Sequence, residues 1–141
     1  MKRIAYPFAI AALALFLASP TPAQSGKVMK GTWTWSCCKD GAYSGSMDLD
    51  EYNDPKYPEY NFSGHFNGAG GGSIVGKIKA NKVTFIRESA ACSSGGKSQT
   101  WTGTIEFSKE LGWVINGTLS GCNDKTDENI KADNKFVMSR K

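Results

Sequence analysis

Four cysteines are the residues of this 141-residue chain with the clearest chemical potential, namely Cys37, Cys38, Cys92 and Cys122. Their spacing lacks the C-x-x-C pair typical of a zinc site, and the chain holds a single histidine. In an oxidising compartment they predict two disulfides, with three possible pairings. Because a bond between neighbours would close a strained ring, we expect Cys37 and Cys38 each to pair with a distant cysteine. Such a bridge closes a loop of roughly 50 to 90 residues and contributes about 4 kcal/mol on the chain-entropy model.

Other polar groups do not assemble a catalytic or metal site. His65 is expected on the polar face of a strand, where no second group completes a proton relay. The stretch Gly71–Lys77 resembles part of a phosphate loop, but Ile78 stands where Ser or Thr is required. A cluster of acids lacks the Gly and terminal Glu of a calcium loop, and we expect it to be solvated: Asp48, Asp50, Glu51 and Asp54. We therefore expect no enzyme, no catalytic residue, no bound metal and no cofactor; a hydrolase would have to lose its activity on His65→Ala.

The N-terminal residues predict a secretory signal peptide. Lys2 and Arg3 precede an almost unbroken apolar run, Ile4–Ala18, which is followed by the Pro-broken, small-residue segment Ser19–Ala23. A membrane anchor would need roughly 20 apolar residues, and this run is shorter. We expect residues 1–23 to be removed and residues 24–141 to form one periplasmic or secreted domain, with no membrane contact after cleavage.

Composition is that of one ordinary globular domain, with 40% apolar and 21% charged residues. The formal net charge is +4, and Lys2 and Arg3 in the predicted signal peptide supply part of it. The remaining positive charge is too small to indicate a nucleic-acid partner.

Two-residue alternation of apolar and polar side chains predicts an all-β domain. One helical turn within 126–134 is the only stretch that competes with this prediction. Eight strands are expected, at Gly31–Ser36, Tyr43–Asp50, Glu59–Asn67, Gly72–Lys79, Lys82–Glu88, Gln99–Phe107, Trp113–Ser120 and Lys135–Arg140.

A weak repeat places one glycine on the apolar face of five strands: Gly45, Gly64, Gly76, Gly103 and Gly117. The same face carries the large apolar side chains, from Trp33 and Trp35 through Tyr60, Phe62 and Phe107 to Met138. Removing Cβ relieves crowding on the concave side of a sharply coiled sheet. We therefore predict an eight-stranded antiparallel up-and-down β-barrel stabilised by disulfides, with a two-layer β-sandwich as the alternative.

In such a barrel the first, fifth and seventh strands end at one rim, so all four cysteines meet at one mouth. Inward glycines leave space there, and aromatic side chains at the strand ends are expected to line a ligand site: Trp35, Tyr43, Phe66 and Trp101. The alternative is that these side chains interlock and fill the barrel.

Two short motifs resemble the calycin superfamily, which includes lipocalins and avidins. Gly31-Thr32-Trp33 is similar to the G-x-W that opens those barrels, and Thr100–Gly103 is similar to an avidin segment. The resemblance implies a small-molecule site at the open mouth and a base closed by Arg140 stacked over Trp33. Ser36–Asp40 replaces the polar cluster of avidins, so the resemblance does not extend to biotin.

Together these features predict an exported, non-enzymatic protein that binds a small, partly apolar ligand at the mouth of a barrel. The alternative is a secreted or periplasmic module that binds or inhibits a protein. In that case the barrel is filled and the contacts are made by the loops at 37–42, 89–98 and 121–132.

Overall fold

The computed structural model describes residues 25–38, 41, 43–68, 71–88, 98–121 and 134–140. The predicted signal peptide, Cys92, Cys122 and nearly all of the possible helical turn at 126–134 lie outside the described residues. Within the described segments, no helix has the length and apolar character needed to cross a membrane.

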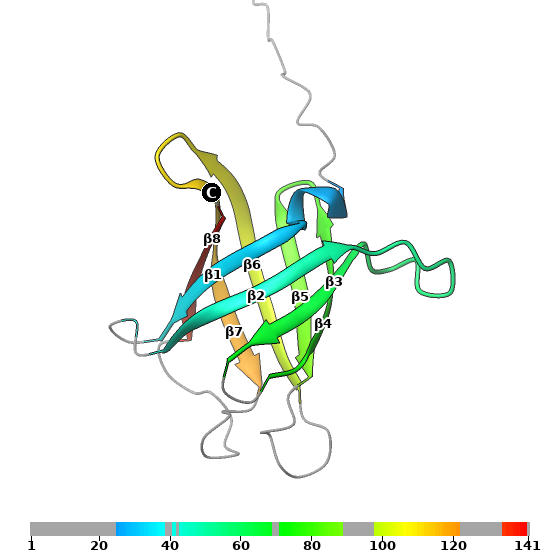
Figure 1. Ribbon diagram of the computed structural model, residues 1–141, viewed down its shortest axis with the longest axis horizontal. Helices are drawn as coiled ribbons and strands as arrows, with labels where there is room; N and C mark the ends of the chain where they lie inside the picture. The colour runs from blue at the N-terminus through cyan, green and yellow to red at the C-terminus, as the bar shows by residue number, and fades with distance from the viewer. Residues whose placement is uncertain are drawn as a thin grey trace, which may run out of the picture.

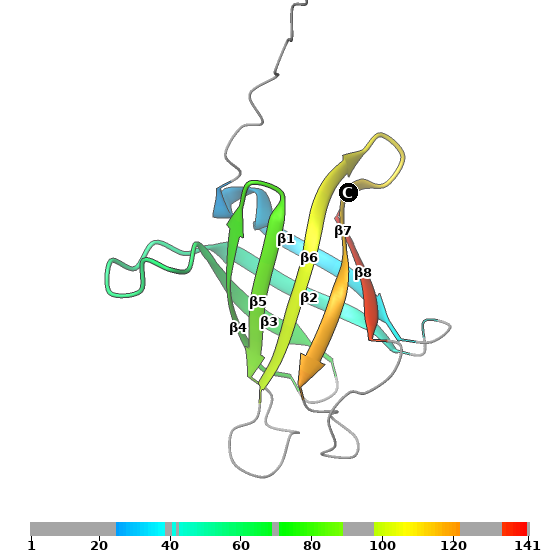
Figure 2. The ribbon, with the colours of Figure 1, turned by 180° about the vertical axis from the view of Figure 1, so that it is seen from behind.

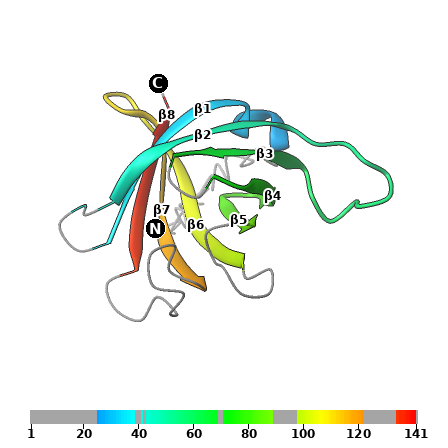
Figure 3. The same cartoon turned by 60° about the horizontal axis from the view of Figure 1, so that its bottom comes forward.

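The chain forms a closed barrel of eight antiparallel strands that follow one another in chain order (Figure 1). The same order is seen from behind in Figure 2 and from the lower end in Figure 3. A single 3-10 turn, η1, precedes the strands. The elements are η1 Gly26–Met29, β1 Gly31–Cys37, β2 Tyr43–Glu51, β3 Phe62–Asn67, β4 Ser73–Lys79, β5 Lys82–Glu88, β6 Ser98–Ser108, β7 Gly112–Gly121 and β8 Lys135–Arg140. The predicted up-and-down barrel is confirmed and the sandwich alternative is wrong.

Closure comes from pairing of the first and last strands. β1 and β8 run antiparallel, with Trp35 opposite Met138 and Cys37 opposite Phe136. Each remaining strand pairs with its sequence neighbour, and the closed sheet leaves no edge open to pairing with another chain.

The predicted strand ends hold to within one or two residues except at the start of β3. Residues 59–61 were expected in the strand, but they belong to the preceding loop, where the Tyr60 amide donates to the Tyr57 carbonyl at 3.1 Å. Asn61 then ties the loop to β4, because its side chain donates to the Ile78 carbonyl at 2.8 Å and accepts from the Ile78 amide at 2.9 Å. A local turn at Tyr60 therefore precedes the strand, while the Asn61 backbone still bonds to the Gly76 carbonyl and to the Tyr52 amide.

The inner face carries the core and all five repeat glycines. Three cross-strand pairs show the arrangement, because Gly76 lies opposite both Phe62 and Phe85, and Gly117 lies opposite Phe136. A Cβ at Gly76 would overlap the Phe62 ring, and one at Gly117 would lie 2.8 Å from a ring carbon of Phe136. Crowding on the concave face, which the repeat predicted, is therefore present.

Four residues predicted for the apolar face are not fully buried, namely Trp35, Tyr60, Phe107 and Trp113. Phe107 is 65% exposed, because β6 and β7 continue beyond the barrel as a hairpin, and its ring packs edge-on against Trp113 with centroids 5.2 Å apart. The projecting hairpin is drawn in yellow at the upper left of Figure 1. Tyr60 is only half-buried, because it lies in the loop before β3.

Candidate ligand-binding site

The two ends of the barrel are named here by the residues that form them. The mouth is the end at which β1 finishes with Cys37 and β2 begins with Tyr43. The base is the opposite end, where η1 leads into β1 at Gly31 and β8 finishes at Arg140. In Figure 1 the base is at the top and the mouth at the bottom.

Strands β5 and β7 also end at the mouth, with Glu88 and Gly121 as their last residues. Cys92 and Cys122 follow these two strand ends in the sequence but lie outside the described residues. The topology therefore agrees with the expected rim for each strand that precedes a cysteine, while the meeting of all four cysteines stays a prediction.

The expectation that Cys37 and Cys38 pair with distant cysteines is contradicted, because the two sulfur atoms lie at disulfide distance from each other. Cys37 is the last residue of β1, and Cys38 has a φ of 72°, which ends the alternation of side chains between the two faces. The Cys38 amide donates to the Lys135 carbonyl at 2.9 Å and its carbonyl accepts from the Gly41 amide at 3.0 Å. A tight turn held by β8 thus brings both sulfurs to the same side.

Three of the four residues predicted to bind ligand come together inside the mouth. The ring centroids of Trp35 and Phe66 are 4.9 Å apart, those of Trp35 and Trp101 are 5.6 Å apart, and those of Phe66 and Trp101 are 6.1 Å apart. Trp101 also stacks on Phe85 at 5.3 Å and packs on Phe136 at 4.8 Å. These five rings, Trp35, Phe66, Phe85, Trp101 and Phe136, are called the mouth aromatic cluster.

Exposure increases outward through this cluster. Trp101 and Phe66 are buried, at 2% and 5% exposed, whereas Trp35 is only partly buried. Tyr43, the fourth predicted residue, lies farther out at the rim, opposite Cys37 in the register and 37% exposed. The aromatic core therefore continues from the barrel interior to the mouth.

The indole N–H groups of Trp35 and Trp101 are buried, and neither has a hydrogen-bond partner among the described residues. An indole can only donate, so each N–H needs an acceptor. Leaving a buried donor unsatisfied costs about 1–3 kcal/mol. Two such donors in one cluster are the most unusual feature of the site.

Arg87 and Gln99 were missed by sequence reasoning and lie at the same level as the cluster. Arg87 is 2% exposed and its guanidinium carbon lies 3.5 Å from the centroid of the Phe66 ring. It donates from Nε and Nη2 to the Gly71 carbonyl, at 2.9 and 2.7 Å, and from Nη1 to the Gln99 side-chain oxygen at 3.1 Å. The alternation that places Phe85 inward also places Arg87 inward, and this signal could have found it.

At the base the corresponding groups are satisfied. Trp33 is fully buried, and its indole N–H donates to the Met29 carbonyl in η1 at 2.7 Å. The guanidinium carbon of Arg140 lies 5.4 Å from the centroid of the Trp33 ring, so the contact expected between these two residues is present. The 3-10 turn and Arg140 together cover the indole that closes this end.

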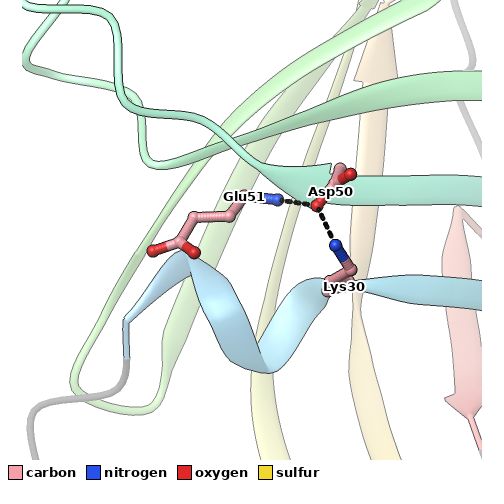
Figure 4. A network of polar contacts seen from close by, with 3 residues as sticks. All are labelled: Lys30, Asp50 and Glu51. Carbon is pink, nitrogen blue, oxygen red and sulfur yellow. Dashed lines mark hydrogen bonds and ion pairs between the residues drawn. The ribbon is translucent and has the colours of Figure 1, made fainter.

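A polar contact fastens the 3-10 turn to the barrel wall (Figure 4). Lys30, directly after η1, places its ammonium 3.1 Å from a carboxylate oxygen of Asp50 in β2, and that oxygen also accepts from the Glu51 amide at 2.8 Å. The hydrogen bond from Lys30, reinforced by the Glu51 amide, lowers the pKa of the Asp50 carboxyl. Both members of the pair are exposed to solvent, so this contact orients η1 more than it stabilises the fold.

Protein rings occupy the space beside several inward glycines. A Cβ on Gly45 would lie 3.1 Å from the Trp35 ring, and the rings of Phe62 and Phe136 fill the space beside Gly76 and Gly117. Protein rings therefore occupy the space beside Gly45, Gly76 and Gly117, where inward glycines were expected to leave room for a ligand.

The outer face offers polar groups of a different kind. His65 is exposed there, near Asp48, whose carboxylate accepts hydrogen bonds from Thr32 and from Asn67. These bonds lower the pKa of Asp48. No cluster of three or more His, Cys, Asp or Glu side chains suited to a metal ion occurs within the segments described above.

No protein-family model, no curated protein and no solved structure matches this chain.

Proposed function

We propose that this protein is an exported, non-enzymatic binding protein that holds a small, partly apolar ligand at the mouth of its barrel. Trp35, Phe66 and Trp101 form the apolar wall, and Tyr43 contributes from the rim. Export by a signal peptide and membership of the calycin superfamily are parts of the same proposal, supported by the N-terminal sequence and by the Trp33–Arg140 contact.

The observation that carries this proposal is the exposure gradient of the mouth aromatic cluster. Trp35 is partly buried, and behind it Trp101 is 2% exposed, so one continuous aromatic surface leads from solvent to the core. A concave or recessed aromatic surface with a few polar groups is the usual character of a small-molecule site. At the base, by contrast, η1 and Arg140 cover the indole of Trp33.

The competing function is recognition of a protein by the loops of a filled barrel. The filling of the space beside Gly76 and Gly117 by protein rings favours it. In that case the mouth aromatic cluster serves only to stabilise the fold, and the partner contacts the loops at 37–42, 89–98 and 121–132.

A titration with N-phenyl-1-naphthylamine, an uncharged apolar fluorophore, separates these functions. The mature protein should bind it with a dissociation constant of about micromolar order, corresponding to roughly 8 kcal/mol. Binding should increase the emission of the probe and quench tryptophan emission. Trp35→Ala should weaken binding, because it removes the outermost ring of the cluster.

Phe107→Ala is the matched control. Phe107 is also aromatic and exposed, but it lies on the hairpin beyond the base. It should leave the affinity unchanged. Equal weakening by both substitutions would show that the probe adsorbs to exposed rings, and silence of the mature protein toward the probe would favour the protein-binding function.

A further inference from the structure

The two unsatisfied indole donors restrict the chemistry of the ligand. We infer that the ligand presents a carbonyl-type oxygen, of a ketone or a carboxylate, to the indole N–H groups of Trp35 and Trp101. This inference rests on the proposed function and deepens it, because an apolar surface alone would accept a hydrocarbon equally well.

The orientation of Trp101 is fixed by its neighbours. Phe85 stacks on its ring with an interplanar angle of 17°, and Phe136 packs against it at 4.8 Å. Trp35 approaches it edge-on, at an interplanar angle of 81°. Because close packing holds this ring in place, its N–H cannot turn toward a backbone carbonyl. A bound ligand would therefore have to supply the acceptor.

The N–H of Trp35 lies beside a position without a side chain. Gly45 is opposite Trp35 in the register, and a Cβ at this glycine would lie 3.2 Å from the Trp35 indole nitrogen. The absence of a side chain therefore relieves crowding next to the donor. Trp35 and Gly45 lie two register positions inside the rim pair of Cys37 and Tyr43.

A buried positive charge favours the same chemistry. Arg87 stacks on Phe66, and the Phe66 ring packs against both Trp35 and Trp101. The guanidinium and the two indoles thus surround one aromatic ring. In surroundings of low dielectric constant, a positive charge near the cluster favours an oxygen that carries negative charge, whether partial or full.

Three probes with the same ring system test the inference by calorimetric titration: 2-ethylnaphthalene, which has no acceptor, 2-acetylnaphthalene, which has a neutral carbonyl, and 2-naphthoate, which has a carboxylate. Trp101→Phe removes the N–H and keeps most of the ring. It should weaken binding of the two oxygen-bearing probes by about three- to tenfold relative to 2-ethylnaphthalene, the loss expected for one hydrogen bond. A purely structural role of Trp101 would weaken all three probes together.

Trp33→Phe is the control, because it removes an indole N–H whose acceptor is already present at the base. It should leave the ratio of affinities among the three probes unchanged. If Trp101→Phe does not fold, Trp35→Phe tests the same ratio on the second donor. A preference for 2-naphthoate over 2-acetylnaphthalene would identify an acid as the natural class, and equal binding would identify a neutral carbonyl compound.

The outcomes also separate the two proposals. If 2-ethylnaphthalene binds at the mouth and the ratio of affinities is the same in the original protein and in Trp101→Phe, the inference about the oxygen is wrong while the proposed function stands. If none of the three probes binds at millimolar concentration, both are wrong.

Discussion

Two tryptophans on one strand show how the ends of the barrel differ. Trp33 and Trp35 both point inward from β1, separated by a single residue. Trp33 is fully buried, donates its N–H to Met29 and is covered by Arg140. Trp35 is partly buried and its N–H has no acceptor among the described residues. The base is a completed structure, whereas the mouth retains hydrogen-bonding capacity that a ligand could use.

The same residue type therefore serves two purposes in this protein. At the base, the buried indole N–H of Trp33 donates to the Met29 carbonyl in the short 3-10 turn η1, which is not part of the barrel sheet. At the mouth, the indole N–H groups of Trp35 and Trp101 have no acceptor among the described residues. A folding requirement explains the first arrangement, but it does not explain the second, because an unsatisfied donor lowers stability.

The largest expected effect comes from truncating the two rings in turn. Trp33→Ala should destabilise the protein by about 3–5 kcal/mol, the range for a fully buried aromatic ring, measured by denaturant unfolding. Trp35→Ala should cost less than about 2 kcal/mol, because its ring is only partly removed from water and its N–H has no bond to lose. Equal losses would remove the distinction between the two ends.

Substitution of two glycines tests where the barrel wall is rigid. In Gly64→Ala the new methyl group would overlap the Asp48 carbonyl and lie 2.8 Å from a methyl carbon of Leu49, so we expect a loss of about 1–3 kcal/mol. In Gly45→Ala the neighbour is the Trp35 ring, which is only partly buried. The stability loss should be below about 1 kcal/mol while probe affinity falls. The reverse order of stability losses would contradict a rigid wall and an adaptable mouth.

Replacing both neighbouring cysteines of the mouth should have a smaller effect. A bridge between Cys37 and Cys38 closes almost no loop, because their sequence separation is 1. On the chain-entropy model it contributes only about 1 kcal/mol, and Cys37→Ser with Cys38→Ser should cost no more than that. Mass spectrometry of tryptic peptides checks the bond itself.

Trypsin is expected to release residues 31–39 as one peptide that holds both cysteines. With the bond between neighbours, this peptide should be lighter than its reduced form by two hydrogen atoms and linked to no other peptide. If the peptide is instead recovered linked to fragments that carry Cys92 or Cys122, the bond between neighbours is wrong and the predicted bonds to distant cysteines are correct.

The smallest expected effect concerns the polar contact at the base. Because the hydrogen bond from Lys30 lowers the pKa of Asp50 below 3.8 in the folded protein, its contribution to stability is present above that pH. The contribution is lost as the pH falls through the lowered folded pKa. In Asp50→Asn the melting temperature should therefore decrease less steeply as the pH falls from 6 to 2, as measured by thermal unfolding.

Lys30→Met is the matched variant for this contact. It removes the other partner and should change the acid limb of the stability curve in the same way, and the double variant should add little. An unchanged acid limb in both single variants would show that the contact between η1 and β2 does not persist in solution.

Strand order and inner face could be predicted from the sequence because alternation and the glycine repeat are local signals. The inward position of Gly76 and Gly117 follows from the period of two and from the crowding of a coiled sheet. The exposure of Phe107 could not be predicted, since the alternation continues in the hairpin although the barrel has ended. The bond between Cys37 and Cys38 depends on the positive φ of Cys38, which the residue type does not indicate.

The site was predicted in part for the same reason. Trp35, Phe66 and Trp101 share the inner face near one rim, and this could be read from strand register. Whether their donors find acceptors is a matter of tertiary geometry. Arg87 lies on the inner face by the same alternation as Phe85, but its residue type does not indicate burial.

The most direct test of the account is the ¹H–¹⁵N spectrum of the four indole groups, recorded with and without saturating N-phenyl-1-naphthylamine and assigned by single Trp→Phe variants. The resonances of Trp35 and Trp101 should shift on addition of the probe. Those of Trp33, bonded at the base, and Trp113, beside the projecting hairpin, should stay in place. A shift of Trp33 or Trp113 with Trp35 and Trp101 unmoved would contradict a ligand site at the mouth.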